Sequence, residues 1–191
     1  MENPYWHDQY KPHQTDRIDI RLLCFEINCV VSTSIGQQGS GMAPDEDDPR
    51  EITILDELCF KMAESELSKR LLKLALLVRT FDETMTRSEK VESYLAHRNR
   101  IELQHEVFGQ VFKGAENSTK TLRECSNKII HAEDVRPVYD TDDSRNAPYA
   151  MWGMTGTLEL EGRRGEAEWS VSIYLKTYLE GILELIQFDE S

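Results

Sequence analysis

The sequence predicts an α+β protein: an antiparallel helical bundle with a small antiparallel sheet formed by an N-terminal strand and a C-terminal hairpin. Three observations support this class. A long helical pattern occupies the middle of the 191 residues, an alternating apolar segment precedes it, and a second alternating segment with a glycine-flanked turn follows it. A chain of this length suits one domain, so we expect residues 1–191 to form a single domain.

The N-terminal part predicts an arm, a strand and a linker. Residues 1–16 are polar and predict an irregular arm. Residues 17–32 alternate apolar and polar positions with one change of phase, which is typical of a long, bulged strand. The apolar positions before the change of phase are Ile18, Ile20, Leu22 and Cys24. Residues 35–50 are rich in glycine and then in acidic residues, which predicts a linker.

Residues 53–132 are predicted to form the helical core. Apolar positions recur there at alternating spacings of four and three, the pattern of a helix packed against its neighbours. In the first helix these positions are Leu67, Leu71, Leu74, Val78, Phe81 and Met85. A second helix is predicted from Ser88 to about Lys113, and a short third helix from Thr119 to Ala132. Arg79 and Asp82, three residues apart, are interpreted as a surface ion pair.

The C-terminal part predicts a loop, a hairpin and a helix. Residues 133–150 are polar and contain two prolines, which indicates a surface loop. Residues 156–188 predict a hairpin followed by a final amphipathic helix, because alternation on both sides of a Gly-Arg-Arg-Gly turn gives way to helical spacing. We expect the early strand and this hairpin to pair in one sheet.

Composition excludes several classes of function. The longest apolar run, Leu71 to Val78, is short and contains Lys73, so no membrane association is expected. The first residues lack the pattern of a secretory signal. The four cysteines have no CxxC spacing and are interpreted as reduced core residues of a cytoplasmic protein. Without an HExxH, a paired Cys/His set, a GxxxxGK[ST] or a GxGxxG segment, we expect neither a metal nor a cofactor.

The net charge of −13 is unevenly distributed. Residues 1–60 contain 4 basic and 12 acidic side chains, residues 61–131 contain 13 and 10, and residues 132–191 contain 5 and 13. The helical middle is therefore mildly basic between two acidic flanks. This distribution argues against a footprint for long duplex DNA but permits a small anion-binding site.

The third predicted helix, TKTLRECSNKIIHA, carries a polar stripe. Arg123, Asn127 and His131 lie four residues apart, so they line one helix face. A guanidinium, a carboxamide and an imidazole on one stripe can hold a phosphate and move a proton, and we predict these three residues as the catalytic set. The alternative is a plain solvated face, whose histidine is favoured by the helix C-terminus.

A second segment competes with this stripe. Arg98, Asn99 and His105 lie on the second predicted helix, with six residues between the arginine and the histidine. That spacing makes nearly two turns and places both side chains on one face. Charged residues in the middle of a long helix are more typical of a solvated face, so this segment ranks second.

The segment LRECSNKIIHA, following two long helices, resembles the HEPN superfamily (higher eukaryotes and prokaryotes nucleotide-binding). The resemblance covers roughly Ile54 to Ala132. In that family a helical bundle carries an arginine, usually a polar residue after it, and a histidine a few residues later. Arg123 and His131 are separated by slightly more than the family's usual interval, which the segment from Arg98 to His105 fits better.

The resemblance implies a metal-independent endoribonuclease, or an RNA-binding component, of a prokaryotic defence or toxin–antitoxin system. It also implies a homodimer in which the two motifs face each other. His131 would then act as general base or acid, Arg123 would neutralise charge on the phosphate, and Asn127 would orient either group. Two alternatives stay open: an inactive HEPN-like module whose acidic flanks dock a protein partner, and an interaction protein whose helical seam forms a dimer bundle.

Overall fold

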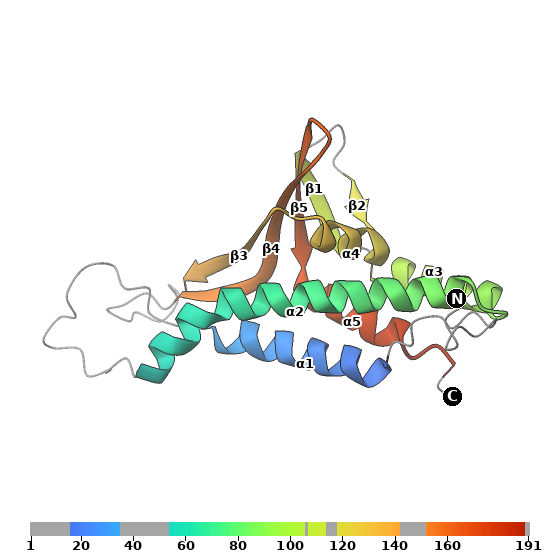
Figure 1. Cartoon of the computed structure of the whole chain (residues 1–191), viewed down its shortest axis with the longest axis horizontal. Helices are drawn as coiled ribbons and strands as arrows, with labels where there is room; N and C mark the ends of the chain where they lie inside the picture. The colour runs from blue at the N-terminus through green and yellow to red at the C-terminus, as the bar shows by residue number, and fades with distance from the viewer. Residues whose placement is uncertain (1–15, 35–53, 106, 114–117, 142–151, 190–191) are drawn as a thin grey trace, which may run out of the picture.

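The computed structural model describes residues 16–34, 54–105, 107–113, 118–141 and 152–189 (Figure 1). These ranges contain five helices and one five-stranded antiparallel sheet, which confirms the α+β class. The helices are α1 (Arg17–Thr33), α2 (Ile54–Thr86), α3 (Val91–Gln104), α4 (Leu122–Ile130) and α5 (Leu175–Leu185). The strands are β1 (Gly109–Lys113), β2 (Thr119–Lys120), β3 (Asp134–Thr141), β4 (Trp152–Arg164) and β5 (Ala167–Tyr174).

The sheet is centred on β5 and β4. Its strand order is β2-β1-β5-β4-β3, and every neighbouring pair is antiparallel. β4 and β5 are joined by a tight turn in which Gly165 has a φ of 65°, a conformation that glycine adopts without strain. Helix α5 follows β5 directly, so the sheet and the last helix share one continuous segment.

The long helix α2 packs against other elements on two of its sides. In Figure 1 it crosses the molecule with the sheet and α4 on one side and α1 on the other. The core lies along the inward face of α2 and between the helices and the sheet. Its fully buried members include Ile20, Ile27, Leu67, Leu71, Leu74, Leu158, Leu160, Val171, Ile173, Tyr178 and Ile182.

The prediction of an N-terminal strand was wrong, because that segment is helix α1. Asp16 caps the helix, its side chain accepting a hydrogen bond from the backbone N–H of Ile18 at 2.9 Å. Ile20 and Ile27 face the core, whereas Ile18 and Leu22 are exposed. Apolar residues on both faces of the helix produced an alternation that fits period two as well as period 3.6, so the pattern alone could not separate strand from helix.

The helical core predicted for residues 53–132 is interrupted after α3. The second helix ends at Gln104 instead of near Lys113, because β1 continues the sheet there and buries Val111 against it. Pairing with β5 thus overrides local helix preference. The predicted loop at residues 133–150 contains β3, which pairs along β4. The prediction of which segments form the sheet was therefore wrong. The hairpin pairs with β1 and β3, and the N-terminal segment contributes no strand.

Two of the predicted segments cannot be compared with the structure. The linker at residues 35–50 and the arm, apart from Asp16, lie outside the described residues. Within the described residues, no helix combines the length and the apolar character that crossing a bilayer requires.

Helix α5 packs closely against Phe108 at a glycine. A Cβ added at Gly181 would lie 2.5 Å from Cε1 of Phe108, whose side chain is buried. We expect Gly181→Ala to lower the free energy of unfolding by about 1 kcal/mol, because overpacking of about 1–3 kcal/mol exceeds the roughly 1 kcal/mol that alanine contributes to helix formation. Urea denaturation measures the change. Glu180→Ala, at an exposed position of the same helix, is the control, and a stabilised Gly181→Ala variant would contradict the close packing.

Candidate functional site

Helix α4 begins at a capping box that fixes its first turn. The side chain of Thr121 accepts a hydrogen bond from the backbone N–H of Glu124, and the Glu124 carboxylate accepts one from the N–H of Thr121 at 2.9 Å. Leu122, Cys125 and Ile129 then face the core. The opposite stripe of the helix, which carries the predicted catalytic set, is consequently turned toward α2 and the hairpin.

Asn127 and His131 lie together in a surface cleft at the C-terminal end of α4, which we call the basic cleft. It is bounded by α2, α4 and the β4–β5 hairpin, and its lining residues are Arg79, Asn127, Lys128, His131, Arg163, Arg164 and Trp169. The His131 side chain is exposed. Four cationic side chains therefore line the same cleft as an imidazole that solvent can reach.

The hairpin meets the end of α4 at Gly162. A Cβ at this position would lie 2.4 Å from the indole ring of Trp169 and 2.9 Å from the backbone carbonyl oxygen of His131. Only a residue without a side chain allows this approach. On the same indole, the ammonium of Lys128 lies 3.7 Å from the ring centre, within the range of a cation–π interaction. Gly162 and Trp169 thus position Lys128 in the wall of the basic cleft.

The basic cleft keeps a net positive charge in an acidic protein. Arg79 pairs with Glu83 at 3.0 Å, and Arg163 pairs with Glu133 at 3.1 Å. Within the described part of the chain, Lys128 and Arg164 make no ion pair. Burial lowers the pKa of Lys128, and the nearby positive charges of Lys120 and Arg164 lower it further. An anion entering the basic cleft would therefore relieve repulsion between cations.

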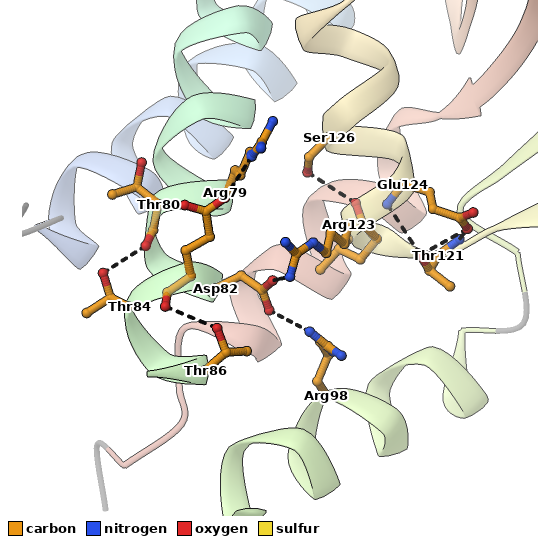
Figure 2. Close-up of polar contacts among 12 residues, drawn as sticks. Arg79, Thr80, Asp82, Thr84, Thr86, Arg98, Thr121, Arg123, Glu124 and Ser126 are labelled. Atoms are coloured by element: carbon orange, nitrogen blue, oxygen red, sulfur yellow. Dashed lines mark hydrogen bonds and ion pairs between the residues drawn. The ribbon is translucent and has the colours of Figure 1, made fainter. Parts of the chain in front are cut away.

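Arg123, the third member of the predicted set, does not line the basic cleft. Its Nη1 donates a hydrogen bond to Oδ2 of Asp82 at 2.8 Å, while Nη1 of Arg98 donates to Oδ1 of the same carboxylate at 2.9 Å (Figure 2). The Tyr94 hydroxyl also donates to Oδ1, at 2.8 Å. The arginines of both candidate motifs thus converge on one carboxylate, which is only 2% exposed.

This cluster corrects the ion pair predicted on α2. Asp82 was expected to pair with Arg79, but Arg79 pairs with Glu83 one turn further along the helix. Asp82 instead joins α2 to α3 and α4. Burial and the Asp82 charge raise the pKa of Tyr94, so its hydroxyl stays a hydrogen-bond donor.

A small cavity beside Asp82 adjoins the basic cleft. Asp82, Arg98, Arg123 and Ser126 contribute to its lining, and Arg79 lines both spaces. The predicted stripe is therefore divided: Asn127 and His131 belong to the basic cleft, and Arg123 belongs to the neighbouring cavity. Arg79 takes the place beside Asn127 and His131 that was assigned to Arg123.

The second candidate segment does not form a site of its own. Nε2 of His105 lies 2.9 Å from a carboxylate oxygen of Glu184 on α5, and its ring packs against Phe108. Asn99 is exposed on α3. Arg98 and His105 are therefore held by different partners, and neither the histidine nor Asn99 lines the basic cleft.

The Asn127 side chain leaves one polar atom without a partner. Its Oδ1 is buried, and within the described residues it accepts no hydrogen bond. A buried carbonyl oxygen normally has a donor. Since this oxygen is shielded from solvent, a ligand in the basic cleft could reach it only after the Asn127 side chain turns.

Sequence reasoning missed most of the cations in the basic cleft. Arg163 and Arg164 were interpreted only as turn residues, and Lys128 was not singled out although it lies three residues before His131. Trp169 was assigned only to the alternation of a strand. Of these residues, only Lys128 could have been predicted from the sequence, because helical spacing places it on the outer surface of the short helix, near the predicted stripe.

Comparisons of this chain with protein-family models, curated proteins and solved structures gave no significant match.

The Asp82 cluster gives a stability prediction. We expect Asp82→Asn to lower the free energy of unfolding by about 2–4 kcal/mol, because the variant leaves two arginines without their shared counter-charge. Chemical denaturation measures the loss. Glu83→Gln removes the partly exposed partner of Arg79 and should change the free energy by less than about 0.5 kcal/mol. Equal effects of the two substitutions would contradict the role assigned to Asp82.

Proposed function

We propose that the protein binds single-stranded RNA in the basic cleft and cleaves it by phosphoryl transfer, with His131 as the proton-transfer group. The observation that supports this proposal is the exposed imidazole of His131 in a cleft that Arg79, Lys128, Arg163 and Arg164 also line. Cations hold a phosphodiester, and an imidazole beside them can serve as a general base or acid.

The charge of the protein favours a single strand. The chain carries a net charge of −13, so a long duplex would be repelled by the protein as a whole. A flexible strand can place one phosphate among the cations. The 2′-hydroxyl of RNA then supplies a nucleophile that DNA lacks.

The proposed reaction uses residues of this chain. The 2′-oxygen attacks the adjacent phosphorus, a P–O2′ bond forms, and the P–O5′ bond breaks to leave a 2′,3′-cyclic phosphate and a 5′-hydroxyl. Neutral His131 takes the proton from the 2′-hydroxyl. Lys128 donates a proton to the departing O5′, a role that its lowered pKa favours.

The other residues of the basic cleft bind and orient. Arg79 and Arg164 neutralise the charge that develops on the phosphorane. Asn127 forms part of the wall of the basic cleft against which the ribose would lie. Arg123 acts indirectly in this scheme, because its guanidinium is bound by Asp82. The role as an HEPN-like component of prokaryotic defence or a toxin–antitoxin system rests on the sequence resemblance alone.

We expect His131→Ala to abolish cleavage of a labelled single-stranded RNA while leaving its binding within about threefold, because the cations that hold phosphate remain. Lys128→Ala should weaken both binding and cleavage. The readouts are gel analysis of the cyclic-phosphate product and fluorescence anisotropy. His105→Ala, which changes a histidine outside the basic cleft, should retain cleavage.

A second control variant tests whether RNA binding depends on the cations of the basic cleft or on any surface lysine. Lys176 is exposed on α5 outside the basic cleft, so Lys176→Ala should bind RNA as the unmodified chain does. RNA binding without cleavage by the unmodified chain would favour the RNA-binding component over the endoribonuclease. No binding at low salt would reject an RNA-directed function, and cleavage that survives His131→Ala would reject the assigned catalytic residue.

A further inference from the structure

Helix α1 is apolar on both of its faces. Its inward face is buried through Ile20, Leu23, Cys24 and Ile27. On the opposite face Ile18 is 62%, Leu22 53% and Phe25 65% exposed. A surface helix of a monomer normally presents a polar outer face, so three large exposed apolar side chains in one row indicate that something covers them.

The exposed row has the spacing of a coiled-coil seam. Ile18, Leu22, Phe25 and Cys29 are separated by four, three and four residues, which assigns Ile18 and Phe25 to heptad position d, and Leu22 and Cys29 to position a. We call these four residues the α1 seam. This spacing fits another helix running along α1, rather than a globular surface or a small molecule.

The residues beside the α1 seam have complementary charges. Asp19 and Glu26 occupy the two e positions on one side, and Arg21 occupies a g position on the other. In two parallel copies, position g of one helix faces position e of the next heptad in the other helix. Arg21 then faces Glu26 of the second copy, and the two-fold axis repeats this contact.

An antiparallel pairing is unfavourable for the same reason. Positions e would face each other, so the carboxylate of Asp19 in one copy would lie opposite that of Glu26 in the other. In its own chain Glu26 accepts a hydrogen bond from Arg70 at 2.9 Å. That contact holds the carboxylate beside the α1 seam without using all of its acceptor sites.

We propose that a second copy of this chain covers the α1 seam, with the two α1 helices parallel about a two-fold axis. In this dimer the apolar row is buried and Arg21 pairs with Glu26 of the other copy in both directions. The proposal does not depend on the proposed function. It also differs from a dimer with facing motifs, because α2 lies between α1 and α4 in each copy (Figure 1).

The expected dimer is of moderate strength. The α1 seam runs from Ile18 to Cys29, so the contact is about 17 Å long at 1.5 Å per residue. An interface this short falls at the small end of specific protein interfaces, and we expect a dissociation constant of about 1–10 µM.

Sedimentation velocity of the full chain tests the association. The unmodified protein should change from monomer to dimer across the micromolar range, and Leu22→Glu should weaken the dimer by at least about tenfold. Leu103→Glu is the matched control, since Leu103 is 82% exposed on α3 outside the α1 seam. Circular dichroism confirms that each variant is folded. A monomer at roughly 100 µM, far above the expected constant, or a dimer that Leu22→Glu leaves intact, would overturn the proposal.

Cross-linking through the native Cys29 tests whether the two α1 helices are parallel, and it requires no substitution in the α1 seam. Position a faces position a only in a parallel pair, so mild oxidation should join the two Cys29 sulfurs in a disulfide-linked dimer. The experiment uses a Cys59→Ser chain, because Cys59 is exposed whereas Cys24 and Cys125 are buried. Cys29→Ser should abolish the cross-link. A dimer that forms no cross-link through Cys29 would overturn the parallel arrangement.

Discussion

One buried carboxylate determines how the helices around the basic cleft are placed. Asp82 of α2 holds Arg98 of α3 and Arg123 of α4, at 2.9 and 2.8 Å, and accepts a third hydrogen bond from Tyr94. A carboxylate that is 2% exposed needs these partners, because an unpaired buried charge is strongly destabilising. Three helices that approach from different directions are thereby fixed to one point.

The basic cleft depends on that arrangement together with one close contact. Asp82 sets where α4 lies against α2, which brings Arg79 beside Asn127 and His131. At the far end of α4, Gly162 lets the hairpin approach the carbonyl of His131 and lets the Trp169 indole lie across it. The indole in turn holds the Lys128 ammonium. Helix and hairpin therefore contribute cations to one space, although they are distant in sequence.

Part of this architecture could be predicted from the sequence, and the failures have physical causes. The long α2 helix was identified from its apolar spacing, which reports burial on one side. Helix α1 was misassigned because apolar residues at Ile18 and Leu22 cover its outer face, and the α1 seam offers a reason for their presence. Strands β1 and β3 were missed because pairing with the hairpin, a long-range effect, determines their conformation.

The residues of the candidate site could likewise be predicted only in part from the sequence. Helical spacing predicted that Asn127 and His131 share a face, and the structure places both in the basic cleft. Spacing could not show that Asp82, 41 residues before Arg123, would draw that guanidinium away. Nor could it bring Arg163 and Arg164 across from another element. Local periodicity describes which side chains share a face, whereas charges in a folded site are assembled from separate elements.

The most direct measurement is a crystal structure of the full chain with a short single-stranded RNA whose 2′-hydroxyls are methylated, so that it cannot be cleaved. The account predicts a phosphate among Arg79, Lys128 and Arg164, with one ribose 2′-oxygen about 3 Å from the His131 ring. RNA bound at a different surface, with the basic cleft empty, would contradict it.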